Sequence, residues 1–229
     1  MSMQIFFFTV CMYEKIQSQK YFYRPCVADV LMFLSWKLYL GIIISTYVIL
    51  ITYMIIDAKN NYNYIIKYKS RGKLFFENIK ESFIFEIILT IYCVVSIIIW
   101  SKILGFEDIV WDKYDSNYFL SIHSTTNIAF NTFVIKYSVI FLFIICIVSL
   151  VAVICSWIGS RLLAIILCLS FFIIDFYMQE HSIIDYILIS YEEIDLSIQN
   201  NIIYGAIVLI IGSLIGCILA MRKEFYGNH

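Results

Sequence analysis

Five long apolar runs constrain this chain more than any other feature. Each is close in length to the helix of roughly 20 residues that crosses about 30 Å of hydrocarbon. In lipid, only a helix or a closed barrel satisfies every backbone amide, and a barrel strand would alternate apolar and polar residues. These runs do not alternate, so we predict that they are helices. They are Tyr39–Ile56, Ile84–Leu104, Phe133–Cys155, Leu162–Met178 and Ile202–Met221.

The composition agrees with lipid as the solvent for most of the chain. Of its 229 residues, 62% are hydrophobic and 14% are charged, whereas a soluble domain carries about 25% charged residues. We therefore predict one all-α domain over residues 1–229, a polytopic helical integral membrane protein of the cell membrane. The net charge of −1 and the scattered basic residues do not suggest a groove for nucleic acid.

The N-terminal stretch Ile5–Tyr13 is apolar but too short to span a membrane alone. No basic region precedes it and no small-residue cleavage site follows it, so it does not read as a secretory signal. We interpret it as a short or partly embedded first helix, and as a shortened sixth span. Six spans with both ends in the cytoplasm is the preferred count, and five is the alternative.

Lys and Arg residues are unevenly distributed among the connections. The connection 57–82 holds six of them, and the C-terminal tail begins with Arg222 and Lys223. The connections 106–131 and 179–201 are acidic, and the second has no Lys or Arg. Because cytoplasmic connections carry an excess of Lys and Arg, we predict that 57–82 and the C-terminus are cytoplasmic and that the acidic connections are external.

Part of the basic connection carries more positive charge than orientation requires. It reads IIKYKSRGKLFFENIK, and in its second half Phe76, Ile79 and Phe83 recur at spacings of three and four. This spacing predicts a short amphipathic helix. One interpretation is that its basic side chains contact anionic lipid headgroups. The other is that a cytoplasmic protein docks on it.

The layout of the chain resembles the six-span permease subunits of type-2 ABC exporters, in particular small bacterial ones associated with export of, or immunity to, peptides and antibiotics. The residues that carry the resemblance are "IIDAKNN…IIKYKSRGKLFF" between two spans and the closing "IIYGAIVLIIGSLIGCILAMRKEF". The chain departs from the family pattern at its start, where the first span is reduced.

The resemblance implies several partners and a coupling site. In such permeases the segment between the second and third spans is cytoplasmic and contacts the ATPase. This chain has no GxxxxGK[ST] phosphate loop, so the resemblance implies a separate ABC ATP-binding subunit. It also implies a second permease subunit, identical or different, and no cofactor. The implied ATPase contacts are Lys67, Lys69, Arg71, Lys73, Phe75 and Phe76.

Three ionisable residues fall within predicted spans, where such groups are costly and often functional. Glu86 and Lys136 lie near the ends of their spans, and we expect both to reach the headgroups. Asp175 is deeper. We predict that it faces a polar pathway between helices or pairs with Lys136.

The last predicted span carries a row of small residues. Gly212, Gly216 and Ala220 lie four residues apart, and Gly205 falls nearby, two turns earlier. Small residues at this spacing let helices approach closely in lipid. The row predicts a packing face, either within this chain or with a second subunit.

The chain offers little for catalysis or metal binding. Its seven cysteines form no CxxC pair or zinc spacing. A membrane peptidase of the Glu-Glu type would need an arginine soon after Glu192-Glu193, and HExxH is absent. His123 and His181 fall in external connections, and His229 ends the sequence. We therefore expect no enzymatic activity and no metal.

A non-transporting membrane immunity or sensor protein remains an alternative. The acidic connection 179–201 mixes apolar and acidic residues, so it would be the external binding surface of such a protein.

Overall fold

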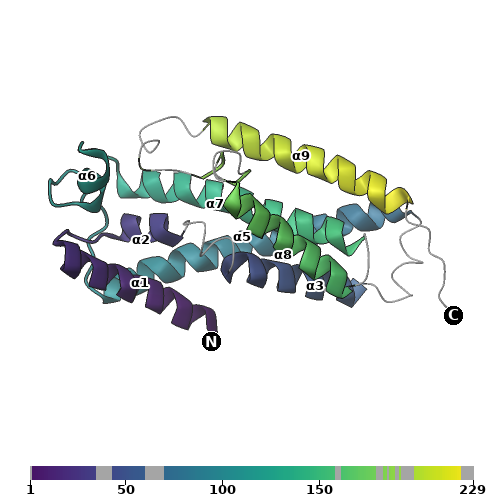
Figure 1. The fold of residues 1–229 in the computed structure, drawn as a ribbon, viewed down its shortest axis with the longest axis horizontal. Coiled ribbons are helices and arrows are strands. Elements are labelled where there is room, and N and C mark those ends of the chain that lie inside the picture. The colour runs from purple at the N-terminus through teal and green to yellow at the C-terminus, as the bar shows by residue number, and fades with distance from the viewer. Residues whose placement is uncertain are drawn as a thin grey trace.

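The computed structural model describes residues 2–34, 43–59, 70–157, 161–178, 183–184, 186–188, 191 and 199–222. The regular secondary structure of these residues is helical, and they contain no strand apart from isolated β-bridges. The all-α prediction is confirmed. The helices are α1 (Ser2–Tyr21), α2 (Val27–Leu34), α3 (Ser45–Lys59), α5 (Arg71–Ile103), α6 (Asn117–Ile122), α7 (Phe130–Ser156), α8 (Arg161–Tyr177) and α9 (Gln199–Arg222) (Figure 1).

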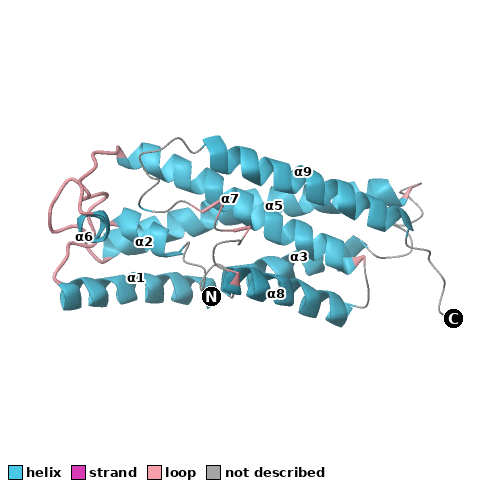
Figure 2. Cartoon of the chain, turned by 45° about the horizontal axis from the view of Figure 1, so that its top comes forward, coloured by secondary structure: helices cyan, strands magenta, loops and turns pink. Residues whose placement is uncertain are grey.

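The long helices run along a common direction, and α7 is the central one (Figure 2). It packs against α3, α5, α8 and α9, and every residue from Ile144 to Leu150 is buried. A helix that is apolar all round belongs in a core. In contrast, only 11% of the most apolar stretch of α9 is buried, against 67% for α7. The helix α9 therefore lies on the outside of the bundle.

In the described part of the chain, three helices are long and apolar enough to cross a membrane: α5, α7 and α9. They contain the predicted spans that begin at Ile84, Phe133 and Ile202. The other two predicted spans correspond to shorter helices, because α3 has 15 residues and α8 has 17. Residues 39–42, the start of the first predicted span, lie outside the described residues.

The helix α1 is longer than the sequence predicts, with 20 residues where the apolar stretch Ile5–Tyr13 has nine. Its second half continues through Glu14, Lys15 and Lys20, so it is not apolar enough to count among the candidate spans. It packs against α5 and α2. Polar contacts fix its start, where the Trp100 indole N–H donates to Gln4 Oε1 at 2.7 Å.

The helix α5 also begins earlier than predicted. Ser70 caps it by accepting a hydrogen bond from the Lys73 N–H at 3.3 Å, and the helix continues for 33 residues without a break. The predicted amphipathic helix and the predicted span from Ile84 are therefore one helix. The predicted connection 57–82 therefore includes the first turns of α5, and its place in the cytoplasm stays a prediction.

The two ends of the bundle differ in character. At one end α5 begins beside the end of α9 (Figure 1), where Gly72 lies against Cys217 and Met221. We call this the basic end, after Arg71, Lys73 and Arg222. At the other end, the α6 end, the loop after α5 folds over α2 through backbone hydrogen bonds, including Val27 N–H to Glu107 O at 2.9 Å.

Candidate functional site

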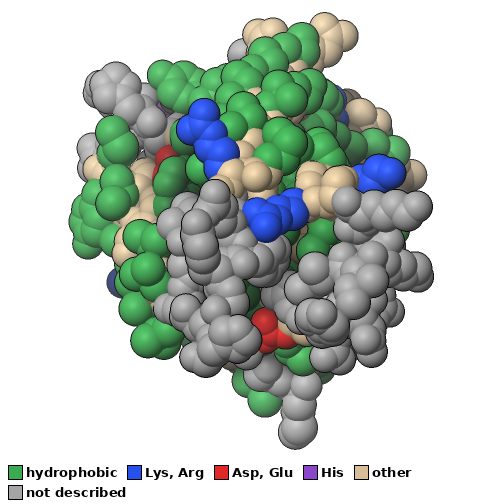
Figure 3. Space-filling view, turned by 90° about the vertical axis from the view of Figure 1, so that its right-hand side faces the viewer, with side chains coloured by type: hydrophobic (Ala, Val, Ile, Leu, Met, Phe, Trp, Pro, Cys, Tyr) green, Lys and Arg blue, Asp and Glu red, His purple; other side chains and the backbone are tan. Residues whose placement is uncertain are grey.

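At the basic end, Phe75 and Phe76 point in different directions. Phe75 is fully buried, with its ring centroid 6.4 Å from that of Trp157, whereas Phe76 is 49% exposed. The prediction that Phe75 contacts an ATPase is therefore wrong, because helical rotation turns it into the bundle. Lys73 is exposed and Arg71 is half-buried. Figure 3 shows Lys and Arg side chains on this end. Lys67 and Lys69 lie outside the described residues.

A row of buried polar side chains follows α5 inward from the basic end. They lie at four-residue intervals, about 6 Å apart along the axis, and all face the interior. Each has at least one side-chain oxygen without a hydrogen-bond partner among the described residues. Buried polar atoms are usually paired, so consecutive unpaired ones require an explanation. We call the row the α5 polar file: Asn78, Ser82, Glu86 and Thr90.

Glu86 is the ionisable member of the file. It is 0% exposed, and neither carboxyl oxygen has a hydrogen-bond partner in the described part of the chain. The expectation that it reaches the headgroups is wrong, because the side chain points between helices. It lies within electrostatic reach of Cys93 on α5 and Cys146 on α7. Glu86 therefore points into the α5–α7 interface.

The other two intramembrane candidates have different surroundings. Asp175 is 5% exposed, and its carboxylate accepts hydrogen bonds from the N–H groups of Ile183 at 2.7 Å and Ile184 at 3.4 Å. These bonds tie Ile183 and Ile184 to the end of α8, which gives Asp175 a structural role. Lys136 is half-buried near the start of α7. Its pairing with Asp175 stays a prediction.

The α6 end contains a polar cluster that sequence reasoning missed. Asp29 is 1% exposed. Its Oδ1 accepts hydrogen bonds from the Trp111 indole at 2.8 Å and the Tyr191 hydroxyl at 3.0 Å. Its Oδ2 accepts from the Cys26 thiol at 3.1 Å and the Cys26 N–H at 3.3 Å.

Glu14 belongs to the same cluster. The Tyr23 hydroxyl donates to its Oε1 at 2.6 Å. Burial raises the pKa of Glu14 to about 7; the Tyr23 hydrogen bond opposes the rise and the charge of Asp29 adds to it. Burial and the Glu14 hydrogen bond also raise the pKa of Tyr23. We call Glu14, Tyr23, Cys26, Asp29, Trp111 and Tyr191 the capping cluster.

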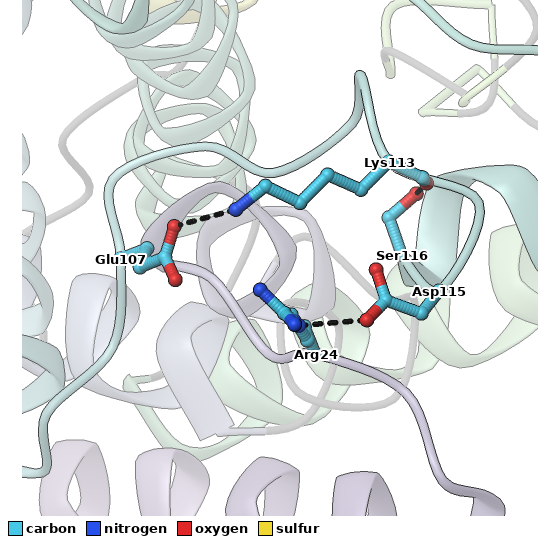
Figure 4. Close-up of polar contacts among 5 residues, drawn as sticks. All are labelled: Arg24, Glu107, Lys113, Asp115 and Ser116. Carbon is cyan, nitrogen blue, oxygen red and sulfur yellow. Dashed lines mark hydrogen bonds and ion pairs between the residues drawn. The ribbon is translucent and has the colours of Figure 1, made fainter.

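Exposed ion pairs also lie at the α6 end (Figure 4). Arg24 lies 2.7 Å from Asp115, and Lys113 lies 3.1 Å from Glu107. Between them, Ser116 Oγ donates to the Lys113 carbonyl at 2.7 Å. Lys102 also pairs with Asp108 at 2.6 Å. The acidic connection that begins at Phe106 is thus partly neutralised by Lys102, which closely precedes it, and by Arg24, from a segment that sequence reasoning did not place beside it.

The small residues of α9 pack within this chain. An added Cβ would lie 3.0 Å from the Phe143 ring at Gly205 and 2.8 Å from Leu150 at Gly212. At Gly216 it would lie 2.3 Å from the Phe75 ring and 2.8 Å from Ile154. Ala220 is fully buried. This row therefore seats α9 on α7 and α5, and the remaining faces of α9 are available to lipid or another chain.

Most residues of the enzyme alternative lie outside the described part of the chain. His123 is exposed at the end of α6, while His181, His229, Glu192 and Glu193 lie outside the described residues. The seven cysteines are free. Within the described ranges, no group of three or more potential ligands could hold a metal ion.

Comparison with protein-family models, with curated proteins and with solved structures finds no match to this chain. What can be inferred about function comes from the arrangement of its own residues.

Proposed function

We propose that this chain is a multi-pass integral membrane protein and the membrane-spanning subunit of an ABC-type exporter that moves a peptide, an antibiotic or a lipid-like substrate. The observation that supports this best is the start of α5. There Lys73 and Phe76 are exposed, while Phe75 anchors the same turn against Trp157. A charged and aromatic surface on a firmly packed helix is suited to protein docking.

The proposed topology follows the path of the chain. The helices α2 and α3 succeed one another along the bundle (Figure 1) and together make one span. The helices α5, α7, α8 and α9 make the others, and Ile5–Tyr13, in the first part of α1, is the shortened first span. The basic end is cytoplasmic, and so is the C-terminus. Three basic residues at the α6 end count little against this orientation, because Arg24, Lys102 and Lys113 form ion pairs with acidic neighbours.

The test is co-purification from native membranes in mild detergent. Wild-type protein should retain an ATP-binding subunit, identified by mass spectrometry and by photolabelling with an azido-ATP. The double variant Arg71→Glu and Lys73→Glu should lose it, because an acidic surface would repel an acidic partner. Lys20→Glu, at the α6 end, is the control and should retain it.

Variants of Phe75 and Phe76 separate loss of ATPase binding from loss of protein stability. Phe76→Ala should weaken retention of the ATPase without changing thermal stability, because the side chain is half exposed. Phe75→Ala should lower the stability of the membrane subunit itself, because it leaves a cavity. If a well-folded wild-type protein retains no ATP-binding subunit, the exporter proposal fails.

The capping cluster favours a second candidate, a non-transporting immunity or sensor protein. Such a protein needs an ordered external surface, and the α6 end carries exposed charges held by a buried hydrogen-bond network. Substitution of exposed Tyr114 or Asp112 on this surface would then abolish immunity, whereas substitutions at the basic end would not.

A further inference from the structure

We propose that Glu86 is a proton-binding site, reached from the basic end through Asn78 and Ser82. This inference does not rest on an ATPase partner. It rests on a fully buried carboxyl group whose oxygens have no hydrogen-bond partner among the described residues. An ionisable group inside a membrane bundle is costly and usually marks a functional site.

Polar side chains connect Glu86 to the basic end of the bundle but not to the α6 end. Ser82 lies one turn toward the basic end and Asn78 one turn further, and both have unpaired oxygens. On the other side, Thr90 continues the file for one turn, and the next position in the series is Val94, which is buried and apolar. The file therefore ends inside the bundle, so it describes a binding site and not a channel through the protein.

The mouth of the file is closed in this structure. Leu74 and Phe75 are buried between Asn78 and the start of α5, in a small apolar cluster with Trp157 and Ala220. A bulky polar ligand has no route past these apolar side chains without their movement. A proton needs no cavity, and it can be passed between oxygens by transiently admitted water.

The donor set also favours a proton over a metal cation. Calcium takes six to eight oxygen ligands, and magnesium demands octahedral geometry. Glu86 has no second carboxylate at hand: among the described residues no other charged side chain acts on it. The titratable groups within its electrostatic reach are the thiols of Cys93 on α5 and Cys146 on α7.

The binding step is a simple proton transfer. A hydronium ion that reaches the file gives one proton to a Glu86 carboxylate oxygen and leaves as water. The carboxyl group becomes neutral and gains an O–H donor. The Ser82 and Thr90 hydroxyl oxygens, one turn away on either side, are the acceptors that this new donor can satisfy.

Dicyclohexylcarbodiimide tests the proposal, because it is apolar and reacts with carboxyl groups in their protonated form. The purified chain in detergent is treated across a pH series and the modified residue is mapped by mass spectrometry. We expect modification at Glu86 that declines as pH rises. Glu86→Asp should keep the modification at this position and Glu86→Gln should lose it.

Glu77→Gln is the matched control. Glu77 lies on the same helix at the basic end, 3.7 Å from Lys80, and its loss should leave modification of Glu86 unchanged. Absence of modification at Glu86 at every pH would overturn the proposal. So would modification that does not change with pH, or protection by sodium ions at constant pH, which would assign the site to a metal cation.

Discussion

Asp29 and Glu86 are both buried carboxyl groups, but their surroundings differ. Asp29 accepts hydrogen bonds from Trp111, Tyr191 and Cys26, whereas Glu86 has no hydrogen-bond partner among the described residues. A buried carboxyl group whose oxygens are satisfied organises the structure around it, and an unsatisfied one destabilises the fold. The capping cluster therefore stabilises the fold. The α5 polar file lowers the stability of the fold, which suggests that its residues have a functional role.

The largest effect should come from removing the Asp29 carboxylate. In Asp29→Ala, the buried donors of Trp111, Tyr191 and Cys26 lose their acceptor, and each costs about 1–3 kcal/mol when unsatisfied. We expect the free energy of unfolding to fall by about 3–5 kcal/mol, measured by thermal denaturation in detergent. Asp112→Ala, at an exposed position in the same connection, is the control. A wild-type melting temperature for Asp29→Ala would show that the network is not structural.

The second effect is that the free energy of unfolding depends on pH through Glu14. Its pKa is raised from 4.5 to about 7, so the folded state holds this proton more tightly than the unfolded state does. The resulting stabilisation is complete below pH 4.5 and is lost as pH rises through 7. It amounts to about 3 kcal/mol. Melting temperatures across this range should fall less steeply for Glu14→Gln. An equal slope in the variant would contradict the assignment.

The contrast with Asp29 predicts that replacing the Glu86 carboxyl group raises the stability of the protein and does not lower it. Glu86→Leu replaces an unpaired polar group with an apolar one of similar size, so we expect a gain in stability of about 1–3 kcal/mol. The measurement is the melting temperature of the purified protein beside that of Asp29→Leu, which should fall. A loss of stability in Glu86→Leu would mean that Glu86 has a partner, and the contrast between the two carboxyl groups would fail.

The smallest effect should come from the exposed ion pairs at the α6 end. Arg24 and Asp115 are 55% and 45% exposed, and such pairs contribute less than about 1 kcal/mol. Arg24→Ala should therefore lower the melting temperature only slightly, and added salt should reduce the difference from wild type. A loss as large as that of Asp29→Ala would show that the cluster depends on these ion pairs.

The apolar runs predicted the helical architecture, because lipid leaves the backbone few alternatives. The sequence divided α5 into an amphipathic helix and a span because Lys80 and Glu81 interrupt the apolar run. Those charges lie on the exposed or half-buried side of the helix, while Leu74, Asn78 and Ser82 on its buried side continue the same row. Reading the polar and apolar residues together at spacings of four would have found the longer helix.

The capping cluster could not be predicted from sequence. Asp29 is 82 residues from Trp111 and 162 from Tyr191, and no local spacing links them. Glu86 was found as an ionisable residue in a span. Its burial, however, depends on which side of α5 faces α7, and a helix with isoleucines on nearly every side does not show this in its sequence.

The length of α5 has a mechanical consequence. Its 33 residues extend about 50 Å, well beyond the thickness of a hydrocarbon layer. Its only glycine, Gly72, is the second residue, and it contains no proline, so nothing in it provides a hinge. The helix is a stiff rod with Lys73 at one end and the carboxyl group of Glu86 near its middle. Any push or tilt applied at the basic end displaces that carboxyl group by the same rigid motion.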